Sequence, residues 1–216
     1  MWEFIDKIVY INLDHREDRR NNMKTFFEKA EIPTDKILRF PAIKRTRGAL
    51  GCLASHTEVL RMAKQNSWKN VLILEDDLEW LDHFEENYKK LEELTKLPKW
   101  DVIMLVGWYW KYDFPRIYNA NNTGAYLVNS SYYDKLLQNR ETSLRKSTRG
   151  IGFDFNSKMY HADIFWKRVQ STDTWYGLNP CMCRQVDGYS DICRQDIKAS
   201  LVYGIGTVEA KTQVYG

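Results

Sequence analysis

The sequence predicts an α/β domain with a mostly parallel sheet and helices on both of its faces. Short runs of β-branched and aliphatic residues alternate with stretches of helical periodicity, a pattern typical of strands joined by crossover helices. Two runs, VLIL at 71–74 and DVIMLV at 101–106, are apolar enough for strands buried on both faces. Neither an internal repeat nor a linker-like stretch divides the chain, so residues 1–216 are expected to form a single domain.

The expected strands are short runs of β-branched, aliphatic or aromatic residues, bounded by turn residues or by a change of period. In chain order they lie at residues 7–13, 36–43, 71–74, 101–106, 123–128, 174–178 and 201–204. Pro41 stops the second run, because a proline cannot donate a hydrogen bond to a neighbouring strand.

The expected helices have apolar residues every three or four positions. In chain order they lie at residues 15–30, about 51–66, 82–97, from 130 onward, and 161–169. Asp14 can cap the first helix and Pro33 ends it. Residues 111–123 lack such a period and are expected to form an irregular connector. Residues 139–158, polar and basic with two glycines, are expected to form a mobile loop.

Composition excludes several classes of protein. A chain that is 44% hydrophobic and 28% charged is not disordered, and a net charge of +3 gives no electrostatic case for nucleic acid. Four cysteines and four histidines form neither a disulfide framework nor a zinc motif. Without a signal peptide or an apolar run of ~20 residues, we expect a soluble, cytoplasmic protein with no transmembrane segment. The sequence also fits a domain excised from a longer chain.

Residues 71–77, VLILEDD, carry the strongest functional signal. The buried run passes directly into Glu75, Asp76 and Asp77, and strands of an open α/β sheet present ligands at their carboxyl ends. Three adjacent carboxylates repel one another unless a cation or a dense set of donors compensates. Mg²⁺ and Mn²⁺ favour carboxylate and phosphate oxygens. The motif predicts a metal or substrate site; the alternative is a solvated turn with acids near a helix N-terminus.

Basic residues cluster at 16–20, 44–47 and 140–149. Such clusters suit a diphosphate or another anionic ligand, although solvated helix faces have the same composition.

Eight blocks in fixed order carry a resemblance to a known family. They are YINLDHREDRRNNM (10–23), FPAI (40–43), GALGCLASHTEVL (48–60), VLILEDD (71–77), WDVIML (100–105), TGAYLV (123–128), HADIFW (161–166) and YGLNPCMCRQVDGYSDI (176–192). Together they resemble glycosyltransferase family 25, which includes lipopolysaccharide sugar transferases and collagen galactosyltransferases. The short chain fits a minimal catalytic domain of bacterial or viral type.

The resemblance implies a GT-A type fold and an inverting transfer of a sugar from a nucleotide-sugar donor, expected to be a UDP-sugar, to a glycan or glycoprotein acceptor. It also implies Mn²⁺ or Mg²⁺ on the donor diphosphate. Asp77 is expected to be the direct metal ligand, with Glu75 as a second ligand or a ribose contact and Asp76 orienting both. The implied donor-binding residues are Ile11, Asn12, Leu13, Arg16, Arg19, His56, Glu75, Asp76 and Asp191.

An inverting transfer needs a base to take the proton of the acceptor hydroxyl. Asp163 matches the acid that the family keeps in the HADIFW block and is the expected base, with a helix N-cap as its alternative. His161 and Ala162 replace the family's usual proline and valine, which puts the local shape and the acceptor choice in doubt. Ser190 and Gln185 are weaker site candidates.

Several of these residues have structural alternatives. The arginines can be surface charges, His56 can be a packing residue, and the Trp108–Tyr109–Trp110 segment can be either an acceptor platform or core. Two other functions also fit the acidic motif. One is a metal-dependent hydrolase of nucleotide sugars or phosphodiesters, and the other is a nucleotide-sugar binding module without activity of its own.

Overall fold

The computed structural model describes residues 1–149, 155–198 and 204–205. Its strands are β1 (Lys7–Asn12), β2 (Ile37–Pro41), β3 (Asn70–Glu75), β4 (Leu78–Trp80), β5 (Val102–Met104), β6 (Trp108–Asp113), β7 (Arg116–Asn121), β8 (Ala125–Asn129), β9 (Trp175–Gly177), β10 (Cys183–Gln185), β11 (Gly188–Ser190), β12 (Gln195–Ile197) and β13 (Gly204–Ile205). Its helices are α1 (Glu17–Lys29), α2 (Gly48–Gln65), α3 (Phe84–Thr95), α4 (Tyr133–Arg149), α5 (Ala162–Phe165) and α6 (Lys167–Gln170), with 3-10 turns η1 (Thr34–Lys36), η2 (Ser130–Tyr132) and η3 (Phe155–Tyr160).

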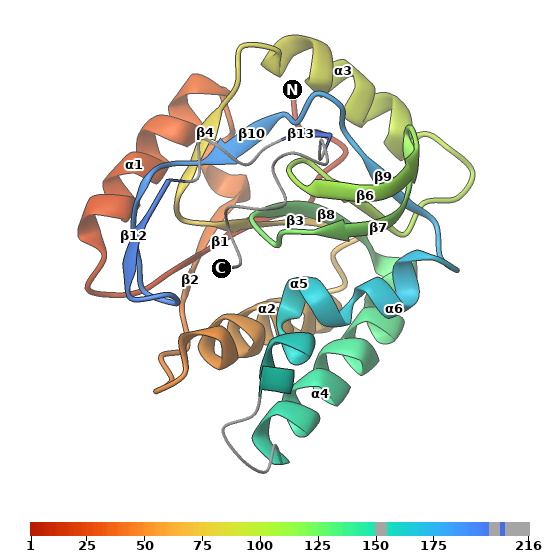
Figure 1. Ribbon diagram of the computed structural model, residues 1–216. Coiled ribbons are helices and arrows are strands. Elements are labelled where there is room, and N and C mark those ends of the chain that lie inside the picture. The colour runs from red at the N-terminus through yellow and green to blue at the C-terminus, as the bar shows by residue number, and fades with distance from the viewer. Residues whose placement is uncertain (150–154, 199–203, 206–216) are drawn as a thin grey trace.

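A nine-stranded sheet with the order β13-β6-β7-β9-β5-β8-β3-β1-β2 runs through the molecule. The helices α1 and α3 cover one face, and α2, α4, α5 and α6 cover the other (Figure 1). The predicted α/β class, with helices on both faces, is therefore confirmed. None of the helices in the described part of the chain is both long and apolar enough to cross a membrane.

The sheet is parallel where β1 pairs with β2 and β3, and again where β5 pairs with β9. Between these parallel parts, β8 runs antiparallel to both β3 and β5. Every residue of 71–74 and 125–128 is fully buried, so the centre of the sheet forms the core. An apolar run reveals burial but not direction, because both faces of such a strand are covered whichever way it runs.

Two expectations for irregular segments were wrong. Residues 111–123 belong largely to the hairpin of β6 and β7. Residues 139–149 continue α4, and the described residues of 155–158 start η3. In this part of α4 the buried side chains are polar: Ser143 Oγ donates to the carbonyl of Tyr160, and Arg140 Nη1 donates to that of Ala162. A buried polar face has no hydrophobic period, which is why the sequence predicted the start of this helix but not its continuation beyond residue 138. Of the strand expected at 201–204, only Gly204 lies among the described residues, where it begins β13.

The parallel strands β1 and β3 end at the same edge of the sheet, with Ile11 opposite Glu75. The N-terminus of α2 packs against this edge at Gly51. A Cβ atom on Gly51 would lie 2.4 Å from the carbonyl oxygen of Ile43, in the segment that connects β2 to α2. Only glycine allows the helix to approach that backbone so closely.

We therefore expect Gly51→Ala to lower the free energy of unfolding by about 1–3 kcal/mol in urea titrations. Alanine gains about 1 kcal/mol over glycine in a helix interior, so a net loss means that backbone crowding prevails. Gln65→Ala, at the exposed end of the same helix, should leave stability nearly unchanged. A Gly51→Ala protein more stable than the wild type would contradict the close approach.

Candidate functional site

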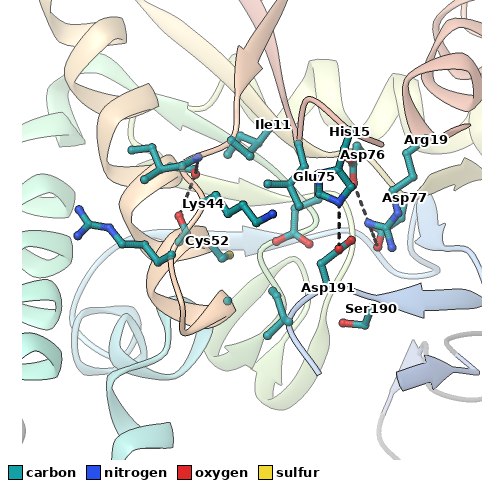
Figure 2. A pocket seen from close by; sticks show the side chains of 18 of the residues that line it. Ile11, His15, Arg19, Lys44, Cys52, Glu75, Asp76, Asp77, Ser190 and Asp191 are labelled. Atoms are coloured by element: carbon teal, nitrogen blue, oxygen red, sulfur yellow. Dashed lines mark hydrogen bonds and ion pairs between the residues drawn. The ribbon is translucent and has the colours of Figure 1, made fainter. Parts of the chain in front are cut away.

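A cavity of about 320 Å³ lies at the carboxyl ends of β1 and β3, between the start of α2 and the β11–β12 hairpin (Figure 2). Eight of the predicted donor or metal residues line it: Ile11, Leu13, Arg19, His56, Glu75, Asp76, Asp77 and Asp191. Asn12 and Arg16 lie behind its wall, where they hold other residues of the site. The structure thus brings the predicted residues of the first and third strands together at one edge of the sheet.

Glu75 points toward α2, the residue that precedes β8 by two positions, and β10. Its Oε1 accepts a hydrogen bond of 2.7 Å from the Thr123 hydroxyl, and its Oε2 accepts one of 3.1 Å from Gln185 Nε2. His56, which is fully buried, places Nε2 3.4 Å from Oε1 of the same carboxylate. The other ring nitrogen, Nδ1, lies 2.9 Å from the hydroxyl of Tyr126. Glu75 is therefore held from three sides.

Asp76 and Asp77 share the guanidinium of Arg19. Nη1 of Arg19 lies 2.8 Å from Oδ1 of Asp76 and 3.1 Å from Oδ2 of Asp77. Asn12 Nδ2 donates a 2.7 Å hydrogen bond to the other oxygen of Asp76. Asn12, predicted as a donor contact, is almost fully buried and positions Asp76 instead of lining the cavity.

The three carboxylates differ in their affinity for protons. Burial and the neighbouring charge of Glu75 raise the pKa of Asp77 to about 7. Burial also raises the pKa of Asp76, although Arg19 opposes that shift. For Glu75 burial acts in the same direction, but the interactions with His56 and Thr123 prevail and lower its pKa. Burial lowers the pKa of His56, so this ring is neutral. Negative charge is therefore concentrated on Glu75, and compensation at Asp77 is incomplete.

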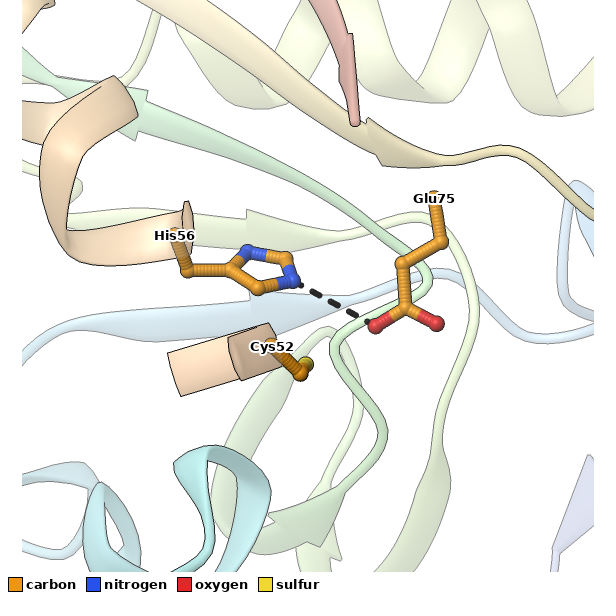
Figure 3. Close-up of side chains that lie close together, drawn as sticks. All are labelled: Cys52, His56 and Glu75. Atoms are coloured by element: carbon orange, nitrogen blue, oxygen red, sulfur yellow. Dashed lines mark ion pairs between the residues drawn. The ribbon is translucent and has the colours of Figure 1, made fainter. Parts of the chain in front are cut away.

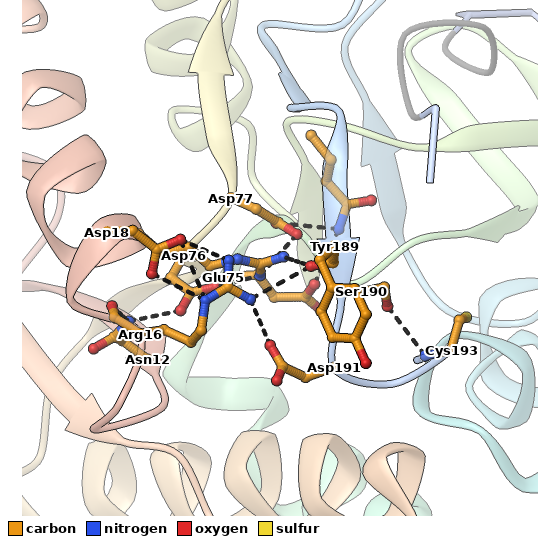
Figure 4. Close-up of polar contacts among 12 residues, drawn as sticks. Asn12, Arg16, Asp18, Glu75, Asp76, Asp77, Tyr189, Ser190, Asp191 and Cys193 are labelled. Atoms are coloured by element: carbon orange, nitrogen blue, oxygen red, sulfur yellow. Dashed lines mark hydrogen bonds and ion pairs between the residues drawn. The ribbon is translucent and has the colours of Figure 1, made fainter. Parts of the chain in front are cut away.

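The β11–β12 hairpin, drawn in Figure 4, is tied to the site by two arginines of the first block. Arg16 Nη1 donates a 2.6 Å hydrogen bond to Asp191, and Nη2 of the same guanidinium pairs with Asp18. Arg19 Nη2 donates a 2.8 Å hydrogen bond to the carbonyl of Tyr189. His15 Nε2 lies 3.5 Å from the second oxygen of Asp191. The hairpin thus forms one wall of the cavity through contacts with α1 and the segment before it.

A second cavity, of about 230 Å³, adjoins the first. Its wall includes Trp108, His161 and Asp163, and it shares Cys52, Glu75, Gln185, Ser190 and Ile192 with the first cavity. Asp163 lies in the first turn of α5, whose N-cap is His161, so the N-cap alternative for Asp163 does not apply. Asn121 Nδ2 lies 3.5 Å from Oδ2 of Asp163.

The aromatic segment after the fourth predicted strand divides between core and surface. Tyr109 is buried, Trp108 is half-buried in the wall of the second cavity, and Trp110 is 42% exposed. Trp110 Nε1 donates a 2.8 Å hydrogen bond to Asn121, the residue that also contacts Asp163. The core alternative therefore holds for Tyr109, and the platform alternative stays a prediction for Trp108 and Trp110.

Cys52, His56 and Glu75 form a second possible metal-binding group, with ligand atoms all within 4.8 Å of one another (Figure 3). Thiolate and imidazole suit zinc and related transition metals, whereas Mg²⁺ and Mn²⁺ favour the oxygens of Asp76, Asp77 and Glu75. Burial, followed by the charge of Glu75, raises the pKa of the Cys52 thiol well above its ordinary value, which opposes metal binding by the thiolate.

Thr123 and Tyr126 were missed at the sequence level, and Gln185 was only a weak candidate. The first two belong to the segment around β8, which lies beside β3 in the opposite direction. The only signal in the sequence was that Thr123 opens one of the quoted blocks. Gln185 comes from β10, which pairs with β4 directly after the acids.

The elevated pKa of Asp77 predicts a pH-dependent effect of Asp77→Asn on stability. Between pH 4 and 7 the folded protein keeps a proton that the unfolded chain has released, so this residue destabilises the fold as the pH rises. Asp77→Asn removes that loss. We compare the free energy of unfolding of Asp77→Asn with that of the wild type, both measured in EDTA. The difference in favour of the variant should be larger at pH 8 than at pH 5, by on the order of 2 kcal/mol. Asp196→Asn, at an exposed position, should show no such difference. Equal pH dependence of the two variants would contradict the assignment.

Comparisons with known proteins agree with this geometry. A sequence model of glycosyltransferase family 25, described as LPS biosynthesis protein, matches residues 41–159. A glycosyltransferase 25 family member of Drosophila melanogaster is 29% identical over 155 residues, 59% of this chain and 25% of that protein. Procollagen galactosyltransferase 1-B of Xenopus laevis is 29% identical over 128 residues, 46% of this chain and 21% of that protein. The chain thus covers about a quarter or less of the length of these curated relatives.

A solved structure supports the fold. The crystal structure of a glycosyltransferase involved in the glycosylation of the major capsid of PBCV-1 is similar with a TM-score of 0.51, over 81% of each chain and at 11% identity. This similarity confirms the GT-A-like α/β fold expected from the sequence. The family model matches more than half of the residues and includes the acidic cluster. The chain therefore belongs to glycosyltransferase family 25.

Proposed function

We propose that the protein transfers a sugar, with inversion, from a UDP-sugar to a hydroxyl group of a glycan or glycoprotein, with Mn²⁺ or Mg²⁺ on the donor diphosphate. The observation that carries the proposal is the pair of adjoining cavities that meet at Glu75. One contains the acidic cluster and several cations, and the other contains Asp163. Two substrates that exchange a sugar need two such sites with a common boundary.

The first cavity suits the donor. Lys44 and Arg45 lie on its wall beside the start of α2, and Arg19 lies opposite them on the side of α1. Ile11 and Leu13 line it at the end of β1, where a nucleotide base can dock on the edge of the sheet. Ammonium and guanidinium groups around a cavity of this size provide the charge that a nucleoside diphosphate requires.

The acidic cluster fits a hard divalent metal. Its oxygens are carboxylates, and burial together with the charge of Glu75 raises the pKa of Asp77 in spite of Arg19. Asp77 and Glu75 would hold the ion, as in the sequence prediction. Asp76 lies beside them and shares the guanidinium of Arg19 with Asp77. A bound Mn²⁺ or Mg²⁺ supplies positive charge to the diphosphate as it leaves the sugar.

The second cavity suits the acceptor. Asp163 lies in it beside the boundary with the donor cavity, where its carboxylate can take the proton from a hydroxyl group that attacks the anomeric carbon. Attack from the side opposite the diphosphate inverts the configuration. Trp108 offers an apolar ring face in the same wall, which suits a sugar.

The names of the relatives bear on the choice of substrate. Two curated relatives are procollagen galactosyltransferases, and the family description refers to LPS biosynthesis. Both kinds of name agree with a hexose donor and a hydroxyl acceptor. Since the chain covers only part of those relatives, the identity of the sugar and of the acceptor has to come from assays of this protein.

Product analysis tests the function. The protein is incubated with a panel of UDP-sugars and of hydroxyl acceptors, with Mn²⁺ or with EDTA. We expect a glycoside and UDP, with Mn²⁺ or Mg²⁺ required. Free sugar or sugar phosphate as the main product would indicate the alternative hydrolase, and donor binding without turnover would indicate a binding module. Undiminished transfer in EDTA would reject the metal requirement alone.

Asp163→Asn should reduce the turnover of transfer by about 10²-fold or more while the Kd for UDP stays within about twofold, because an amide cannot take the proton. The two quantities are measured by product formation at saturating donor and by calorimetry. Asp113→Asn, at the exposed end of β6, is the control and should retain wild-type turnover. Full turnover of Asp163→Asn would reject its role as the base.

A further inference from the structure

Arg19 already occupies the cation position of the acidic cluster. Its Nη1 lies between Oδ1 of Asp76 and Oδ2 of Asp77, at 2.8 and 3.1 Å, and its side chain is only 16% exposed. Figure 2 shows the guanidinium beside these carboxylates in the wall of the donor cavity. The proposed metal ligands are Asp77 and Glu75, so a divalent ion at this site competes with the guanidinium for the carboxylate of Asp77.

The same guanidinium also holds the β11–β12 hairpin. Nη2 of Arg19 donates a 2.8 Å hydrogen bond to the carbonyl of Tyr189, next to Ser190 and Asp191 in the cavity wall. Movement of Arg19 away from the acids therefore removes a link between α1 and the hairpin. Arg16 keeps its own hydrogen bonds to Asp191 and, at 3.4 Å, to the carbonyl of Tyr189, so the hairpin loses one of the three hydrogen bonds that these two arginines donate to it.

We propose that Arg19 is a resident counter-ion that exchanges with the divalent metal, and that this exchange loosens the β11–β12 hairpin over the donor cavity. The inference rests on the metal site of the proposed function. Metal binding to Asp77 has to break the charge-assisted contact of Arg19 with this carboxylate, so the metal alone binds weakly. A donor diphosphate in the cavity gives the displaced guanidinium new anionic partners, which favours binding of metal and donor together.

The exchange predicts that removal of Arg19 strengthens metal binding. Arg19→Gln removes the competing cation, and the Kd for Mn²⁺ alone, measured by electron paramagnetic resonance of the free ion, should fall by about tenfold or more. Arg19→Lys retains one charge but not the two-pronged guanidinium, and its Kd should lie between those of Arg19→Gln and the wild type. This second variant keeps the test valid if Arg19→Gln does not fold.

Arg20→Gln is the matched control. It removes the same charge from the same helix, but Arg20 contacts Asn12 and the carbonyl of Asp14 and not the acids. Its Kd for Mn²⁺ should change by less than about threefold, the size expected of a screened charge without direct contact. An equal gain in both variants would indicate a general electrostatic effect and overturn the inference, as would an unchanged or weaker affinity of Arg19→Gln.

Hydrogen exchange of the backbone tests the link to the hairpin. Mn²⁺ should increase exchange of residues 188–197 in the wild type, and Arg19→Gln should show the faster exchange without metal. Exchange that Mn²⁺ leaves unchanged or slows in the wild type would overturn the coupling. Neither measurement requires turnover, so this inference and the proposed function can fail separately. If the wild type transfers a sugar but Arg19→Gln binds Mn²⁺ no more tightly than the wild type, only this inference is rejected.

Discussion

Repulsion among three consecutive carboxylates at the end of a buried strand is the constraint on which the site depends. An unpaired buried charge costs several kcal/mol, a large fraction of the stability of an ordinary domain. Each element at this edge of the sheet supplies a compensating group. α1 provides Arg19, α2 provides His56, β1 provides Asn12, and the segments beside β8 and β10 provide Thr123 and Gln185. The convergence of so many partners on one motif is the structural reason for placing the function here.

The compensation is uneven in a way that suits a ligand. Glu75 has neutral hydrogen-bond partners and a lowered pKa, whereas Asp77 has a raised one in spite of Arg19. A motif selected only for stability would have neutral or fully paired residues at this position, because well-packed apolar groups are often as stable as buried ion pairs. Perturbed carboxyl groups that line a cavity are typical of functional sites. The negative charge on Glu75 and Asp77 that their protein partners do not neutralise can attract a cation.

The sequence predicted the parts of the site that depend on local pattern. VLILEDD placed three acids at the end of a buried strand, and the first block placed Arg19 one helical turn into α1, near the neighbouring strand end. Thr123, just before β8, was not predicted, because an apolar strand does not reveal that β8 lies antiparallel between β3 and β5. Gln185 of β10 was only a weaker candidate. The start of α4 was predicted but its continuation beyond residue 138 was not, because Arg140 and Ser143 bury polar side chains against backbone carbonyls and a polar face has no hydrophobic period.

The residues that the family model matches form only part of the proposed site. Residues 41–159 contain the acidic cluster and His56, but Arg19, Asp163 and the β11–β12 hairpin fall outside them. Those outer residues meet the acids only through the fold, Arg19 by direct contact and Asp163 across the wall shared by the two cavities. In the proposed function, the matched segment supplies the carboxylates of the metal site, whereas the guanidinium that competes with the metal and the proposed acceptor base come from the flanking segments. The site is therefore complete only when the fold brings the flanking segments against the matched one.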